Sequence, residues 1–176
     1  MNGIFFRLRL WQRRRSEVFA GIEICGHEEF LLCTKAALRL LHPARQFQEI
    51  VSHIAIIRQG TRSGMKAWGK QPTFVVGRRT WQHSALWYAG AIAHDAFHAK
   101  LYRDAKRENP ATEPHANTWT GADAEKKCLA FQKETLRALN ADAETIAYIE
   151  ACAENPTYQG HNTGWRSWLD YLKRWW

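Results

Sequence analysis

Long apolar runs, paired cysteines and internal repeats are all missing from this 176-residue sequence. No stretch approaches the ~18 consecutive apolar residues of a membrane-spanning helix, so we do not expect an integral membrane protein. The four cysteines form no Cys-x-x-Cys pair and have no zinc-finger spacing, which favours buried, reduced thiols over a disulfide framework. With 45% hydrophobic and 24% charged residues, the composition is that of one soluble globular domain.

Basic charge is concentrated at the N-terminus, where five arginines precede the first acidic residue, Glu17, in a chain of formal net charge +8. Aromatic and aliphatic residues are interleaved with these arginines. We therefore expect residues 1–18 to form a basic, aromatic arm that can contact an anionic surface, followed by a single globular domain over residues 19–176. The arginines lie within and after the short apolar patch, the wrong order for a secretory signal, which predicts a cytoplasmic protein. Basic residues elsewhere match no nucleic-acid motif, so no specific nucleic-acid partner is predicted.

Hydrophobic periodicity predicts that most of the chain is helical. The predicted helices are residues 28–41, a long middle helix from a Ser84 cap to about residue 106, residues 120–139 and residues 142–153. The C-terminal stretch carries one apolar stripe, which core packing explains best. Its members are Trp165, Trp168, Leu172 and Trp175.

Two segments before the middle helix have the composition of strands. Residues 49–58 and 73–77 are rich in β-branched residues, and Gly60 with Ser63-Gly64 marks a turn between them. These segments predict a small antiparallel sheet. The expected fold class is therefore α+β, mostly helical, with the sheet preceding the middle helix.

The middle helix carries two histidines four residues apart, His94 and His98. Residues at this spacing lie on one helix face, and the separation suits two imidazole nitrogens that bind one ion at about 2.0–2.1 Å. The stripe that contains them is otherwise apolar, and two buried imidazoles need polar partners. Small residues nearby, such as Gly90 and Ala91, allow another element to approach closely.

The next helix offers a carboxylate as that partner. Glu125 falls on the same stripe as Leu129 and Leu136, where a buried carboxylate requires a cation. Two histidines and one glutamate can satisfy one another around one metal ion. This is the ligand set of an open catalytic zinc site, in which water takes the fourth position.

The five residues from His94 to His98, HDAFH, resemble the HExxH helix of the zincin metallopeptidases. Residues 121–125, GADAE, resemble the downstream helix of the gluzincin branch of that superfamily. The resemblance implies that His94, His98 and Glu125 bind Zn²⁺ and that the substrate is a peptide or protein. It also implies a single zincin-like domain in which a sheet edge flanks the substrate cleft.

One position departs from the family pattern, because Asp95 stands where the zincins have the glutamate that acts as general base. The aspartate is shorter by one C–C bond, about 1.5 Å. The resemblance implies that Asp95 accepts a proton from the zinc-bound water. To reach that water with a shorter side chain, either the helix lies closer to the metal or a second water relays the proton. If neither holds, hydrolysis is weak or absent. Four residues are candidate donors to the oxyanion: Tyr88, Tyr102, His115 and His161.

Two other interpretations fit parts of the sequence. His94-Asp95 also resembles the paired residues of HD-type metal phosphohydrolases, whose remaining ligands here would be His53 or His83 and Asp123 or Asp142. That interpretation leaves His98 and Glu125 without roles. In the second, the chain is a non-catalytic zinc-binding or interaction protein, and its nine tryptophans and basic arm make the contacts.

Overall fold

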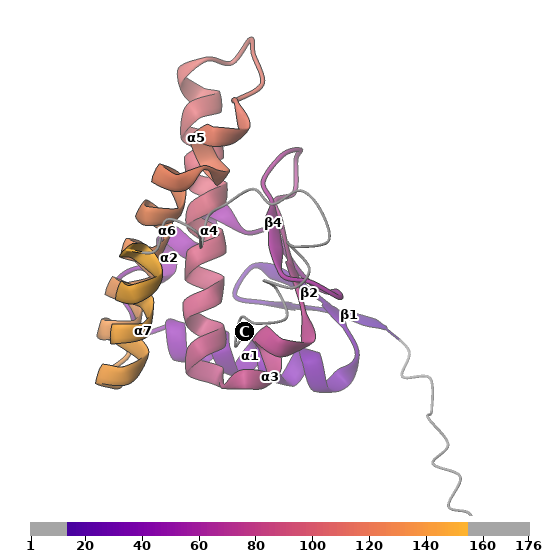
Figure 1. The fold of residues 1–176 in the computed structure, drawn as a ribbon. Helices are drawn as coiled ribbons and strands as arrows, with labels where there is room; N and C mark the ends of the chain where they lie inside the picture. The colour runs from indigo at the N-terminus through magenta and orange to yellow at the C-terminus, as the bar shows by residue number, and fades with distance from the viewer. Residues whose placement is uncertain (1–13, 155–176) are drawn as a thin grey trace, which may run out of the picture.

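A long helix, α4 (Ala85–Glu108), runs through the middle of the molecule between a sheet on one side and two helices on the other (Figure 1). The computed structural model describes residues 14–154. Its strands are β1 (Arg15–Phe19), β2 (Ile22–Gly26), β3 (Ile56–Gln59), β4 (Gly64–Lys66) and β5 (Thr73–Val76). Its other helices are α1 (Glu28–Leu41), α2 (Phe47–His53), α3 (Arg78–His83), α5 (Ala116–Thr120), α6 (Ala122–Ala138) and α7 (Ala143–Glu154). The α+β fold class predicted from the sequence is confirmed.

The sheet is mixed, with the strand order β1-β2-β3-β5-β4. Strands β2, β3 and β5 are parallel, whereas β1 and β4 run antiparallel to them at the two edges. The prediction of an antiparallel sheet is therefore wrong for its centre. The physical reason is the connection from β2 to β3, because a crossover through α1 and α2 returns the chain in the same direction.

The segment predicted as a strand over residues 49–58 is helical in its first half. Helix α2 covers residues 47–53 and buries Phe47 and Ile50, which are three apart on one helix face. Only Ile56–Gln59 forms a strand, and Ile57 in its middle is fully buried. A short apolar run fits a buried helix as well as a strand, so composition alone did not separate the two.

A hairpin that the sequence did not predict opens the described chain. Strand β1 pairs with β2 through a two-residue turn at Ala20 and Gly21, both with positive φ, 51° and 80°. Two positive φ values are typical of the tight turns that suit the twist of a hairpin. Residues 15–18, assigned to the basic arm, thus belong to the sheet, while residues 1–13 lie outside the described part of the chain.

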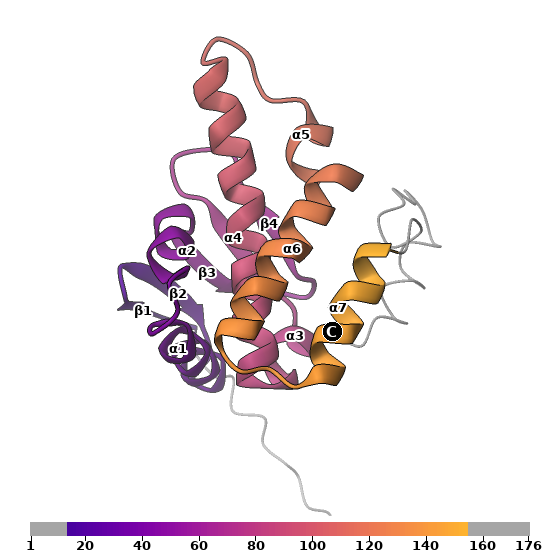
Figure 2. The ribbon, with the colours of Figure 1, turned by 90° about the vertical axis from the view of Figure 1, so that its left-hand side faces the viewer.

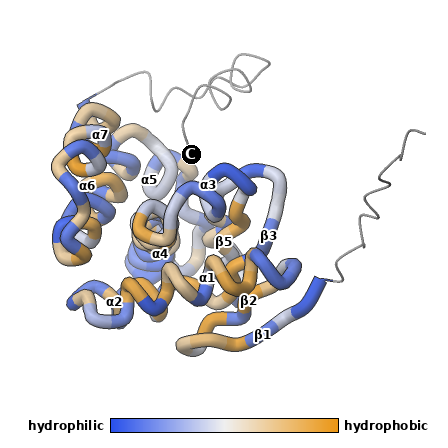
Figure 3. Tube along the Cα trace, turned by 90° about the horizontal axis from the view of Figure 1, so that it is seen from below, coloured by the Kyte–Doolittle hydropathy of each residue, from blue (hydrophilic) through white to orange (hydrophobic). Residues whose placement is uncertain are grey.

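Helix α4 is the structural centre of the fold, and its prediction is confirmed. Ser84 caps its N-terminus by accepting a hydrogen bond from the Trp87 backbone N–H at 3.0 Å. Viewed along its axis, α4 lies between the sheet with α1 and the pair α6 and α7 (Figure 3). Gly90 lets α6 approach, since a Cβ there would lie 3.0 Å from Leu136 Cδ2. This close packing places residues of α6 directly against the histidine-bearing face of α4.

The helix predicted over residues 120–139 is present as α6, which begins two residues later, and a separate short helix, α5, precedes it. Gly121 is the N-cap of α6, and Thr120 instead bonds the Ala116 carbonyl within α5. Helix α7 follows and packs against α6 (Figure 2). Within residues 14–154, none of the helices has the length and apolar character needed to span a membrane. The apolar stripe predicted between residues 165 and 175 lies outside the described residues.

Candidate metal centre

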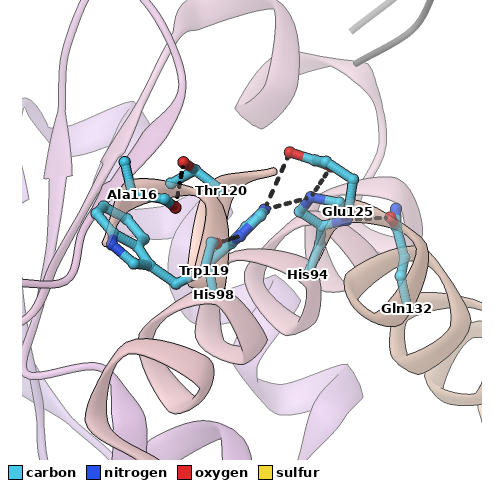
Figure 4. Close-up of polar contacts among 7 residues, drawn as sticks. All are labelled: His94, His98, Ala116, Trp119, Thr120, Glu125 and Gln132. Atoms are coloured by element: carbon cyan, nitrogen blue, oxygen red, sulfur yellow. Dashed lines mark hydrogen bonds and ion pairs between the residues drawn. The ribbon is translucent and has the colours of Figure 1, made fainter. Parts of the chain in front are cut away.

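His94 and His98 point from α4 toward the same spot between α4 and α6 (Figure 4). Their Nε2 atoms are 3.1 Å apart. His98 is buried and His94 is largely buried, with side-chain exposures of 9% and 13%. The one-face geometry that the sequence predicted for this pair is therefore present.

Glu125 reaches the two histidines from α6. Its Oε2 lies 3.3 Å from His94 Nε2 and its Oε1 lies 3.3 Å from His98 Nε2. Gly121 starts α6 and sets the glutamate in its first turn, opposite the middle of α4. The structure thus brings together all three residues for which the sequence predicted a shared ion.

The spacing of these donor atoms fits a tetrahedral metal ion. Bonds of about 2.0–2.1 Å at tetrahedral angles put neighbouring donor atoms about 3.3–3.4 Å apart. The two histidine nitrogens are 3.1 Å apart, and each lies 3.3 Å from a different oxygen of Glu125. The three residues are therefore close enough to share one Zn²⁺ ion, with the carboxylate facing both imidazoles.

The remaining ring nitrogen of each histidine is held by an oxygen. His94 Nδ1 lies 3.1 Å from Gln132 Oε1, and His98 Nδ1 lies 2.5 Å from the Trp119 carbonyl oxygen. Because these oxygens accept, each Nδ1 donates its hydrogen and each Nε2 is directed at Glu125. Such outer contacts orient metal-binding imidazoles and increase their basicity.

Electrostatics couples the three groups. Burial opposes ionisation of Glu125, but its hydrogen bonds with His94 and His98 hold its pKa well below the ordinary value. Burial also disfavours the charged form of His98, yet hydrogen bonds with Cys128 and Glu125 raise its pKa to about 11. A metal ion bound here would have to displace the proton on His98, because only a neutral imidazole is a metal ligand.

Asp95 lies beside the three donors. It is buried, and this burial raises its pKa to about 6 against the opposing effect of His94 and His98. Together with His94 and Gln132 it lines a chamber of about 20 Å³. A cavity needs about 10–15 Å³ to hold one water molecule, so this chamber accommodates one beside the carboxylate.

Cys128 is a potential ligand that the sequence analysis missed. It is fully buried on α6, and its Sγ lies within 4.8 Å of the ligand atoms of His94 and His98. The signal was its position three residues after Glu125, which puts both side chains on the α4-facing side of α6. The spacings considered from the sequence were those between cysteines, and the spacing from Cys128 to Glu125 was not among them.

The predicted oxyanion donors are placed elsewhere. Tyr88 is fully buried and its hydroxyl is 2.9 Å from Thr34 Oγ1 on α1. The Tyr102 hydroxyl donates to Glu113, and His115 accepts from the Asn117 N–H as the cap of α5. His161 lies outside the described residues.

The additional ligands of the HD-type interpretation do not join the cluster. His53 ends α2 among the charges of Lys100, Arg103 and Asp104, and burial is the largest cause of its lowered pKa. His83, Asp123 and Asp142 are exposed. Among the described residues, the histidine, cysteine and acidic side chains whose ligand atoms all lie within 4.8 Å of one another are His94, His98 and Cys128.

Comparisons with known proteins add no relative. No model of a protein family matches the chain, and neither a curated protein nor a solved structure matches it. The function is therefore argued from the geometry of this centre.

Proposed function

We propose that the protein is a zinc-dependent hydrolase of the zincin type, acting on peptide bonds. The observation that carries the proposal is the arrangement of His94, His98 and Glu125, whose donor atoms lie 3.1–3.3 Å apart. When bound there, Zn²⁺ would lower the pKa of a water ligand and polarise the scissile carbonyl. With three protein ligands, the fourth position stays available for that water.

Asp95 is the proposed general base. It adjoins the ligand His94 on α4 and lines the chamber that has room for one water molecule. The Asp95 side chain is one C–C bond shorter than the glutamate of the zincins. A water molecule in the chamber can relay the proton across the remaining distance. Asp95 is buried, and this burial raises its pKa to about 6, toward the range that suits a general base.

A peptide substrate is supported by the edge of the sheet. Strand β4 is the outermost strand on the α4 side, and its residues Gly64 and Lys66 are exposed. Directly after β4, Ala67 packs against Tyr102 and Trp119, which places this edge next to the His98 end of the centre. An extended peptide can add to an exposed strand edge through main-chain hydrogen bonds.

Cys128 supports a second candidate function, a non-catalytic zinc site. A thiolate ligand from Cys128 would fill the fourth position, and zinc sites closed by four protein ligands are structural. Cys128 Sγ lies within 4.8 Å of the histidine donors, and the Glu125 oxygens lie 3.3 Å from them. Glu125 therefore supplies the third ligand in both arrangements, and ligation by Cys128 is what distinguishes the closed site from the open one.

Metal analysis and hydrolysis assays test the proposal together. We expect protein purified without a histidine tag to hold one zinc per chain by elemental analysis and to cleave casein-derived peptides. Asp95→Asn should keep the zinc and lose cleavage, with Asp104→Asn on the same helix as the matched control. Absence of zinc, or full cleavage by Asp95→Asn, would contradict the proposal.

Cobalt substitution separates the open site from the closed one. If Cys128 is a ligand, Co²⁺-loaded protein shows a thiolate charge-transfer band. Cys128→Ser then abolishes this band, whereas the control Cys152→Ser, at the other buried cysteine, keeps it. We expect no such band and unchanged hydrolysis in Cys128→Ser. A band together with the absence of hydrolysis would establish the structural site instead.

A further inference from the structure

A groove of about 450 Å³ lies next to the chamber at Asp95, between the start of α4 and the start of α7. Trp87 and Tyr148 line both spaces, so the groove adjoins the chamber of the candidate metal centre. The groove is lined by His83, Trp87, Asp142, Glu144, Thr145 and Tyr148.

Aromatic rings form one wall of the groove. Trp87 packs edge-on against Tyr148 with ring centroids 5.7 Å apart, and His83 lies 5.4 Å from Trp87 on its other side. Such rings have electron-rich faces that attract organic cations, most strongly for tryptophan. This wall therefore suits an apolar chain that ends in a positive group.

Two carboxylates also line the groove, one before α7 and one in its first turn. Asp142 and Glu144 are exposed, and neither forms an ion pair with a residue in the described part of the chain. Asp142 accepts hydrogen bonds from the Thr145 N–H at 2.7 Å and the Thr145 hydroxyl at 3.1 Å, which lower its pKa and keep it ionised. The groove thus carries two negative charges, and its lining within residues 14–154 includes neither a lysine nor an arginine.

We infer that this groove binds the cationic side chain of a lysine or arginine in the substrate. The inference rests on the proposed function, because the groove adjoins the chamber lined by His94 and Asp95. The aliphatic part of the side chain would lie along Trp87 and Tyr148, and its charged end would meet Asp142 and Glu144. The groove would make the protein selective for peptides with a basic residue near the cleaved bond.

A binding experiment tests the groove without requiring hydrolysis. The probe is N-acetyl-arginine methylamide, and its control is the citrulline analogue, which has nearly the same shape but no charge. The readout is the indole N–H signal of Trp87 in a nitrogen–proton NMR spectrum, assigned with Trp87→Phe. We expect the arginine probe to shift this signal and the citrulline analogue to bind about tenfold more weakly.

Variants of the carboxylates give the second readout. Asp142→Asn with Glu144→Gln should weaken arginine binding about tenfold, while the fold is retained because asparagine caps a helix as well as aspartate. Glu144→Gln alone, at an exposed position, should weaken it by about threefold. Asp123→Asn, an exposed carboxylate on α6 away from the groove, is the matched control and should leave binding unchanged. Equal binding of both probes, no shift of the Trp87 signal, or full binding by the double variant would overturn the inference.

Failure of this inference is distinguishable from failure of the proposed function. Cleavage of peptides with no preference for basic residues would leave the hydrolase and remove the groove's role. Selective arginine binding in a protein that holds no zinc would leave the groove and remove the hydrolase. The zinc content, the cleavage sites and the NMR titration are measured on the same full-length chain.

Discussion

Replacing Glu125 with glutamine is the sharpest test of the metal centre, because the change removes one charge and hardly alters the shape. The wild-type chain has three donors already at metal spacing. Free zinc at about a thousand times its Kd stabilises the folded state by about 4.1 kcal/mol. For a domain of this size, each kcal/mol corresponds to about 2–4 °C in Tm, so zinc should raise the wild-type Tm by about 8–16 °C.

The glutamine variant should lose most of that rise. Loss of an outer contact to a metal ligand costs about 10–100-fold in affinity, and loss of the ligand itself costs at least as much as the upper value. At the same zinc concentration, the stabilisation then falls to about 1.4 kcal/mol or less, a rise of at most about 6 °C. Histidine–carboxylate contacts also stabilise the metal-free protein, so each variant is compared with its own Tm in EDTA.

Scanning calorimetry with EDTA and with buffered zinc measures these shifts. Asp123→Asn removes an equal charge from the exposed side of the same first turn of α6 and should keep the wild-type rise. The reasoning is refuted if zinc leaves the wild-type Tm unchanged. It is equally refuted if Glu125→Gln retains the full rise.

Three further changes test the surroundings of the centre. Gln132→Leu should weaken zinc binding about 10–100-fold in a competition titration, because His94 Nδ1 loses its partner. Gly90→Val should lower the free energy of unfolding by about 1–3 kcal/mol in urea titrations, since the added methyl groups enter the space of Leu136, and Leu136→Ala in the same chain should recover part of that loss. Tyr88→Phe should cost about 1–2 kcal/mol in the same assay, through a buried hydrogen bond, and leave zinc content unchanged.

Local spacing was sufficient for the helices and for part of the site. The Ser84 cap, the bounds of α1 and the shared face of His94 and His98 depend on residues within one or two turns, and all three agree with the structure. Glu125 was found because a charge on an apolar stripe requires a partner. The short helix α5 was missed, since it depends on packing of Trp119 against Tyr102 rather than on its own five-residue sequence.

Residues distant in the sequence decided the rest of the site. The parallel centre of the sheet follows from the β2–β3 crossover, and the helical state of residues 47–53 follows from packing of α2 against α4. The Trp119 carbonyl that orients His98 is a backbone atom, so its residue type carries no signal for this role. The approach of Cys128 likewise depends on the rotation of α6 about its axis.

The sequence by itself determined which side chains one helix face presents, because helical geometry repeats every 3.6 residues whatever surrounds it. It therefore specified two imidazoles and a carboxylate that needed partners. Only the tertiary structure decided that they meet at 3.1–3.3 Å, because that distance depends on how closely α6 approaches α4 at Gly90. The aromatic, acidic groove likewise depends on the tertiary structure. Its lining residues come from three helices and the turn before α7, and they share no sequence pattern.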